Sequence, residues 1–381
     1  MSDPLLGPSV PLVPPLYPSS VYNLPDLDAL DRVTNGQEPG FIYARDGHPN
    51  SKILADKLAA LEAARWAIVC GSGMAALTAS FLGYVSAGQR IVASNRLYGR
   101  TVKLLRQELQ RFGVKTTIVD CNDLDAVRAA FAEPARVLFT ETMSNPLCRT
   151  VDVPALGEIA HANGAKFVVD NTFATPVLFR PLDHGADLVM ESLTKVIGGH
   201  SDVTLGVVAG NDPELLPALQ QIVSTWGLAP NPFDCWLCDR GLPTLEWRVR
   251  ASSANAAVLA DWLAGQPGVS RVVYPRQPDH PDHAIARRLF GSFFGHMLCF
   301  ELAGGRDAVN RFMRQAPAIP FSPSLGHYAT TISHPDTTSH RYESPAEKRR
   351  QGITGGLIRV SVGVEPFEQI NREMAKGLSL E

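Results

Sequence analysis

The sequence has little of what would place it in several large protein classes. Its 35 basic and 38 acidic residues give a net charge of only −3, and the basic residues form no block. This balance argues against a nucleic-acid partner. The chain also lacks an apolar run of about 18 residues that could span a bilayer, and its N-terminus lacks the regions of a secretory signal. We therefore predict neither nucleic acid nor a membrane as a partner.

Cysteine is scarce as well, with six residues spread over 381 positions. They stand at positions 70, 121, 148, 235, 238 and 299. This spacing does not suit a disulfide framework and fits a reducing compartment, so the sequence predicts a cytoplasmic protein. Histidines near positions 280 and 334 stand in turn-forming sequences without a third ligand at a usable spacing. We therefore predict no metal site.

The chain does have enough apolar sequence for more than one core. Hydrophobic residues make up 45% of the composition, which at this length favours two or three domains. Residues 1–25 contain seven prolines and cannot form a helix or a central strand. We expect an extended arm over residues 1–50 that packs on another part of the protein or contributes to a neighbouring subunit.

Residues 51–245 alternate between apolar strands and helical patterns. Apolar strands separated by helices predict an α/β layer with a mostly parallel sheet, and ligands of such sheets bind beyond the carboxyl ends of the strands. We interpret this stretch as a large domain and residues 246–381 as a smaller C-terminal α/β domain. The predicted strands span 66–70, 90–94, 116–120, 137–142, 166–171, 186–193, 205–209, 269–275, 297–303 and 357–363.

One lysine stands out at the exit of the apolar strand 186–193. Lys195 is preceded by two hydroxyl residues and followed by a glycine-rich loop. A lysine that forms a Schiff base needs such a place, because partial desolvation leaves its amine neutral and nearby donors hold an anion. Taken alone, however, Lys195 fits a surface lysine at the end of a strand better than it fits a catalytic one.

Two further strand ends carry chemistry that would suit this lysine. Gly71-Ser72-Gly73-Met74 joins a strand to a helix, where free N–H groups can hold a phosphate, although such turns also serve as plain connections. Asp170 ends an apolar strand 25 positions before Lys195, and it is either a helix cap or a site residue. A lysine paired with a carboxylate is typical of pyridoxal-phosphate enzymes.

These features belong to a longer ordered series, through which the chain resembles the Cys/Met-metabolism family of pyridoxal-phosphate enzymes from about residue 14 to the C-terminus. The resemblance implies fold type I, the aspartate-aminotransferase-like α/β fold. The series comprises Tyr43-Ala44-Arg45, Gly71-Ser72-Gly73-Met74, Tyr98-Gly99, Glu141-Thr142 with Asn145-Pro146, Asp170-Asn171-Thr172-Phe173-Ala174-Thr175-Pro176, Ser192-Leu193-Thr194-Lys195 with Gly199-His200-Ser201-Asp202, Ser324-Leu325-Gly326 and Ile358-Arg359-Val360-Ser361-Val362-Gly363.

The resemblance implies pyridoxal 5'-phosphate as the cofactor. Lys195 would bind the cofactor aldehyde and then act as the mobile acid or base, Asp170 would pair with the pyridine nitrogen, and Tyr98 would stack on the ring and could also move a proton. The remaining expected cofactor-binding residues are Gly73, Met74, Ser192 and Thr194 at the phosphate, Asn145 near the ring oxygen, and Tyr43 and Arg45 from a neighbouring subunit.

The substrate side of the resemblance implies a homotetramer built from two catalytic dimers and acting on a small amino acid. Arg359, assisted by Ser324, would bind the substrate carboxylate, a task that suits a planar guanidinium. Arg100 stands where the family usually has a small or thiol-bearing residue. It is either a reader of a second carboxylate on the substrate or a solvated helix arginine.

The resemblance leaves the reaction type open. Our first prediction is γ-elimination from a sulfur-containing amino acid such as cystathionine or methionine, giving a 2-oxo acid, ammonia and a thiol. The alternative is γ-replacement, as in cystathionine γ-synthase or an O-acyl-homoserine sulfhydrylase, and a silent scaffold is a third reading. Pro323 and His327 depart from the cystathionine γ-lyase pattern, so the distal group of the substrate is not predicted.

Overall fold

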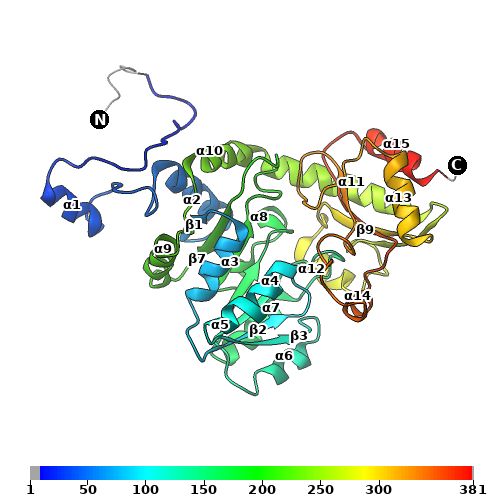
Figure 1. Ribbon diagram of the computed structural model, residues 1–381, viewed down its shortest axis with the longest axis horizontal. Helices are drawn as coiled ribbons and strands as arrows, with labels where there is room; N and C mark the ends of the chain where they lie inside the picture. The colour runs from blue at the N-terminus through cyan, green and yellow to red at the C-terminus, as the bar shows by residue number, and fades with distance from the viewer. Residues whose placement is uncertain (1–8, 380–381) are drawn as a thin grey trace.

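Two β-sheets follow one another along the chain, and helices cover them (Figure 1). The structure is a computed structural model and describes residues 9–379. The larger sheet precedes the smaller one in sequence. A large, mostly parallel sheet with a smaller sheet after it confirms the predicted α/β class.

The larger sheet contains seven strands in the order β1-β7-β6-β5-β4-β2-β3. Only β7 runs against its neighbours β1 and β6, and the other pairings are parallel. Several strands are buried along their full length because helices cover both faces, which explains their continuous apolar sequence. The strands are β1 (Trp66–Cys70), β2 (Arg90–Ser94), β3 (Lys115–Val119), β4 (Val137–Glu141), β5 (Lys166–Asp170), β6 (Leu188–Ser192) and β7 (Gly206–Gly210).

Helices between these strands begin at residues that can cap them. Ser72 accepts the N–H of Ala75 at the start of α3 (Gly73–Leu82), and Asp152 caps α7 (Val153–Ala162), where a proline stands in the first turn. The other helices around this sheet are α2 (Pro49–Leu61), α4 (Gly99–Lys103), a π-helical turn (Leu104–Glu108), α5 (Leu109–Arg111), α6 (Leu124–Ala130), α8 (Thr175–Leu178), α9 (Leu215–Thr225) and α10 (Pro232–Gly241).

The smaller sheet is antiparallel throughout, in the order β10-β11-β9-β8. The long helix α11 (Leu245–Ala264) runs from the larger sheet to this one (Figure 1). A single apolar cluster includes residues of both sheets, such as Phe167 and Phe300. The elements are β8 (Val269–Val273), β9 (Met297–Leu302), β10 (Thr331–Ser333), β11 (Leu357–Ser361), α12 (His283–Phe290), α13 (Gly305–Gln315), α14 (Pro345–Gln351) and α15 (Phe367–Leu378).

The N-terminal segment extends away from the sheets before it returns to them (Figure 1). Its described part contains one short helix, α1 (Leu27–Thr34), which the sequence did not predict. Asn50 fastens the segment by accepting the N–H of Tyr17 and donating to the carbonyl of Pro15. Apolar side chains such as Leu12 remain exposed in the single chain.

Three chain-wide observations bear on the predicted absences. All six cysteines are buried free thiols. Within residues 9–379, no helix is both long and apolar enough to cross a membrane. In the same range, no group of three or more His, Cys, Asp or Glu side chains could hold a metal ion.

Candidate active site

The predicted site residues gather where parallel strands end. Glu141, Asp170 and Ser192 are the last residues of β4, β5 and β6, which are neighbours in the sheet. Because these strands run in the same direction, their carboxyl ends meet at one edge. Lys195 follows β6 by three positions and therefore lies at this edge.

Lys195 is half-buried and faces a residue from the distant part of the chain. Its Nζ donates to Oγ of Ser324 at 3.0 Å. Burial lowers the pKa of the Lys195 amine, and the positive charge of Arg359 lowers it further. Both effects favour the neutral amine, which is the form that can attack a carbonyl or accept a proton.

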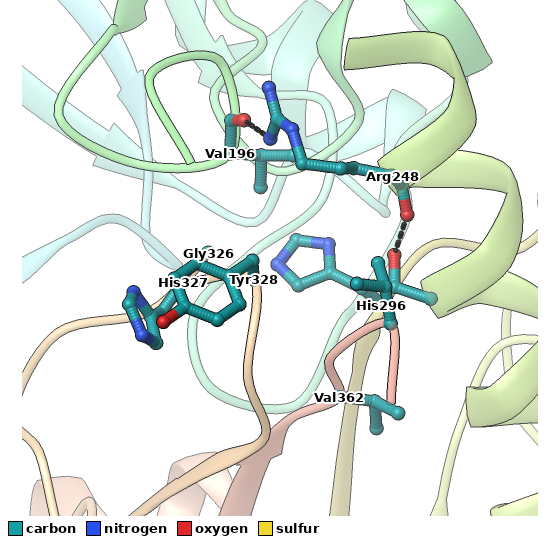
Figure 2. A pocket seen from close by; sticks show the side chains of 9 residues that line it. Val196, Arg248, His296, Gly326, His327, Tyr328 and Val362 are labelled. Atoms are coloured by element: carbon teal, nitrogen blue, oxygen red, sulfur yellow. Dashed lines mark hydrogen bonds between the residues drawn. The ribbon is translucent and has the colours of Figure 1, made fainter. Parts of the chain in front are cut away.

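The loop after Lys195 is held by residues that the sequence did not single out. Arg248 of α11 donates to the carbonyls of Val196 and Ile197, and Figure 2 shows its bond to Val196. On another side lies Gly326, whose φ is +79°, and a Cβ there would come within 2.5 Å of the Val196 nitrogen. The sequence does not indicate this role of Arg248, because an arginine within a helical pattern is normally expected to be exposed to solvent.

A small cavity lies behind this loop, between Val196, Arg248, His296 and Tyr328 (Figure 2). Its volume of about 10 Å³ suits a single water molecule and is far too small for a cofactor or an amino acid. The cavity is therefore separate from the strand-end site in which Lys195 meets Ser324.

Asp170 lies across the edge from Lys195, on β5. One of its oxygens accepts the N–H of Thr172 at 2.9 Å, which holds the carboxyl at the end of the strand. Burial raises the pKa of Asp170, and the hydrogen bonds from Thr172 oppose that shift. A positive partner at this edge would therefore gain a strong interaction with the ionised carboxylate.

The start of α3 forms a cradle for an anion against β6. Ser72 caps the N–H of Ala75, so the cap leaves the N–H groups of Gly73 and Met74 unused. A Cβ at Gly73 would come within 2.8 Å of the Ser192 hydroxyl oxygen, so only glycine permits this close approach. The Thr194 hydroxyl, by contrast, exchanges hydrogen bonds with the main chain of Leu205.

Arg359 of β11 brings a guanidinium to the same place. It is 2% exposed, and it donates to Oδ1 of Asn145 at 2.8 Å and to the carbonyl of Ser324 at 2.9 Å. Its Nε has no hydrogen-bond partner among the described residues. A buried guanidinium with an unused N–H is suited to a carboxylate ligand. Ser324 contacts both Arg359 and Lys195, so the cation and the amine lie on either side of it.

Tyr98 and Arg100 stand at the start of α4. The N–H of Tyr98 donates to Oε1 of Glu141 at 2.5 Å, which holds the tyrosine beside the strand ends. Tyr98 is 40% exposed, so its ring faces open space from this anchored backbone. Arg100 is exposed on the same short helix.

Tyr43 and Arg45 are the two predicted cofactor residues that the single chain does not bring to this edge. They lie in the loop that ends the N-terminal segment, and the Arg45 guanidinium stands over the Tyr43 ring at 5.3 Å from its centre. Tyr43 is 43% exposed. The nearby Asp46 side chain bonds to Ser224, at the end of α9.

A pair of buried acids lies behind β6. Glu62 and Glu191 are fully buried, and the two carboxyls face each other. Burial raises the pKa of Glu62 to about 7 and raises that of Glu191 well above its ordinary value. Neither oxygen of Glu62 has another partner among residues 9–379, whereas Glu191 accepts from Asn171. The pair therefore holds a proton at neutral pH.

Comparison with known proteins gives a consistent result. The family model described as Cys/Met metabolism PLP-dependent enzyme matches residues 9–379. The chain is 41% identical to an O-succinylhomoserine sulfhydrylase of Pseudomonas aeruginosa, over 90% of this chain and 85% of that one. It is 37% identical to an L-methionine γ-lyase of Fusobacterium nucleatum subsp. polymorphum, over 96% and 93%. Cystathionine γ-synthase of Xanthomonas oryzae pv. oryzae in complex with cystathionine superimposes with a TM-score of 0.91 at 34% identity, over 96% and 92%.

Fold and site together define a fold type I enzyme that depends on pyridoxal phosphate. The chain belongs to the Cys/Met-metabolism family of PLP-dependent enzymes. This family includes carbon–sulfur lyases and transferases, and its members perform both γ-elimination and γ-replacement on amino acids.

The residues present fit this cofactor. The Gly73 turn offers two N–H groups beside the Ser192 hydroxyl, because the missing side chain of Gly73 lets the turn approach β6 closely. Lys195 supplies an amine whose pKa is lowered. Asp170 supplies a carboxylate for a protonated ring nitrogen.

Proposed function

We propose that this enzyme catalyses γ-elimination from a sulfur-containing amino acid such as cystathionine or methionine. The products would be a 2-oxo acid, ammonia and a thiol. One observation carries the proposal: Ser324 is bonded to both Lys195 and Arg359. A substrate carboxylate on Arg359 therefore presents its α-carbon to the Lys195 amine.

Each residue at this edge has a proposed task. The bound cofactor supplies an electron sink that stabilises negative charge on the substrate carbons. Lys195 would hold the cofactor, then accept the α-proton at Nζ and deliver it elsewhere on the substrate. Asp170 would keep the ring nitrogen protonated, and Tyr98 would cover the ring and could protonate the leaving sulfur. Gly73, Met74, Ser192 and Thr194 bind the phosphate, the last through its main chain or after its hydroxyl has turned from Leu205.

The second candidate is γ-replacement, and the exposed Arg100 favours it over elimination from methionine. A cation at the mouth of the site would attract a distal carboxylate, which both an O-succinyl group and cystathionine carry. The relative that is 41% identical carries the name O-succinylhomoserine sulfhydrylase. Methionine lacks such a carboxylate, so Arg100 would not assist it.

A substrate panel distinguishes the two reactions. Purified enzyme is incubated with cystathionine, methionine, O-acetylhomoserine or O-succinylhomoserine, with and without cysteine or sulfide. Release of a 2-oxo acid from cystathionine or methionine without an added thiol supports elimination. Product that forms only when a thiol is present would contradict elimination and support replacement.

Replacement of the lysine tests the proposed chemistry itself. Lys195→Ala is expected to reduce turnover by at least about 10³-fold, because the same amine holds the cofactor and moves the proton. It should also remove the absorbance of lysine-bound cofactor. Lys115→Ala, at an exposed position of β3, is the control. Turnover that survives in Lys195→Ala would refute the assignment.

We also propose the setting in which the enzyme works. A homotetramer of two catalytic dimers would let Tyr43 and Arg45 reach the phosphate of a neighbouring subunit, which their exposure in the single chain supports. Six free thiols suit the reducing cytoplasm. We keep the division into an arm over residues 1–50, a large domain over 51–245 and a small domain over 246–381.

A further inference from the structure

Glu141 is a buried acid for which the reaction proposed above has no use. It is the last residue of β4, it is 6% exposed, and its register partner on β5 is Asp170. Burial raises the pKa of Glu141, and the neighbouring Asp170 raises it further. A carboxyl in such a place is costly unless its hydrogen bonds recover the loss.

Those hydrogen bonds come from two different loops. Oε1 of Glu141 accepts the N–H of Tyr98 at 2.5 Å. The backbone of Asn145, in the loop that follows Glu141, lowers the pKa of the Glu141 carboxyl and so partly offsets the effect of burial. The first loop leads from β2 into α4 and carries Tyr98. The second follows β4 and carries Asn145, whose side chain accepts from Arg359.

The end of β4 therefore lies between two hydrogen bonds. Glu141 is bonded to Tyr98, and four positions later Asn145 is bonded to Arg359. Arg359 contacts Ser324, and Ser324 contacts Lys195. Glu141 thus lies between Tyr98 and Asn145, whose side chain holds Arg359, the residue that would bind the substrate carboxylate.

We propose that Glu141 is a positioning residue that fixes Tyr98 relative to Asn145 and Arg359. This inference rests on the function proposed above. The single carboxyl sets where the cofactor ring is covered and where the substrate carboxylate is held. Its removal therefore weakens cofactor binding and substrate binding together, although the side chain contacts neither ligand.

Three substitutions separate positioning from plain stability. Glu141→Gln keeps an acceptor oxygen at the same reach, Glu141→Asp keeps the charge but is one methylene too short for Tyr98, and Glu141→Ala removes the acceptor. Glu301→Ala is the matched control, because it removes a partly buried carboxyl and its bonds to Arg271 and Thr354 in the other sheet.

The readouts are the dissociation constant of pyridoxal phosphate from the apo-protein, the KM and kcat for the best substrate of the panel, and hydrogen exchange at residues 96–102 and 143–147. We expect Glu141→Ala and Glu141→Asp to weaken cofactor binding and raise KM by about tenfold each, which corresponds to about 1.4 kcal/mol. Both loops should exchange faster. Glu141→Gln should stay within about threefold of wild type, and Glu301→Ala should lower the melting temperature only.

The proposal fails if Glu141→Asp or Glu141→Ala binds cofactor and substrate as wild type does, or if Glu141→Gln is as damaging as Glu141→Ala. Exchange measured on Glu141→Asp and Glu141→Gln decides the matter even where Glu141→Ala does not fold. A wild-type protein that does not bind pyridoxal phosphate would contradict the proposed function instead, so the two failures give different results.

Discussion

Arg359 is fixed before any substrate arrives. Two of its nitrogens are bonded to Asn145 and Ser324, while its Nε remains without a partner among the described residues. Ordering a long side chain costs conformational entropy, and here the protein itself has already met that cost. The guanidinium therefore loses little further conformational entropy when it binds a carboxylate.

The substitution Arg359→Lys tests this role. A lysine keeps the positive charge but cannot bond to Asn145, Ser324 and a carboxylate in one plane. We expect KM to rise by about 10- to 100-fold, with a smaller change in kcat. Steady-state kinetics on the preferred substrate measures both, and Arg271→Lys, at a half-exposed position, is the control. A fall in kcat alone would contradict the role.

The pair Glu62 and Glu191 makes a prediction about pH. In the folded protein the pKa of Glu62 is about 7, whereas an unfolded glutamate has a pKa of about 4.3. Between these values the folded state holds a proton that the unfolded state has released. The contribution of the pair to stability is therefore greatest below pH 4 and is lost as the pH rises to about 7.

Glu62→Gln removes this titration and keeps the polar contact with Glu191. Its free energy of unfolding relative to wild type should rise between about pH 5 and about pH 7, by up to about 1.4 kcal/mol per pH unit. Chemical denaturation at several pH values measures the difference, and Glu158→Gln, at an exposed position, is the control. A difference that does not vary with pH would show that the pair does not titrate in this range.

At the scale of elements, the loop after Lys195 depends on the shape of a neighbouring loop. Gly326→Ala would place a Cβ against the Val196 nitrogen, so the lysine loop must shift. We expect both lower stability and a fall in kcat of at least about tenfold. Gly268→Ala is a matched control, since its φ of +83° carries similar strain but nothing lies within 4 Å. Equal kinetic effects of the two substitutions would contradict the prediction.

Elements with a long pattern were predictable from the sequence, and short ones were not. All seven strands of the larger sheet were predicted within about two residues, because most of them are short apolar runs set off by helical patterns or loops. The three-residue β10 is too short to show a period. The helix α14 was not predicted, although Ser344 and Glu347 form a capping box that marks its start. The antiparallel direction of β7 has no signal within the strand itself, because its five residues are small or apolar throughout.

Some residues of the site could likewise be predicted from the sequence, and others could not. The positions of Lys195, Asp170 and the Gly73 turn at the ends of strands were predictable, because each follows or ends an apolar run. The contacts of Arg248 and Glu141 join segments that are distant in sequence, so local patterns do not reveal them. Only the folded arrangement shows that these two residues hold the loops of the site.

At the scale of the whole molecule, Arg45 raises the question of which subunit completes the site. The variants Lys195→Ala and Arg45→Ala should each be nearly inactive. If Arg45 serves a neighbouring subunit, each mixed catalytic dimer contains one intact site, so co-expression should restore about one quarter of wild-type activity. Activity is measured on the whole purified mixture of oligomers, in which random pairing makes about half of the catalytic dimers mixed. No recovery would mean that Arg45 acts within its own subunit or not at all.

Because all six thiols are buried, the folded enzyme should react little with thiol reagents. A thiol reagent needs an accessible thiolate, and burial raises the pKa of several of these cysteines, that of Cys70 to about 12. A maleimide dye should therefore leave the native protein almost unlabelled. A single cysteine introduced at an exposed position, such as Leu12 in the N-terminal segment, would then carry the only probe. Fluorescence transfer between two such probes would report where the segment lies in the working assembly, without the native cysteines being removed.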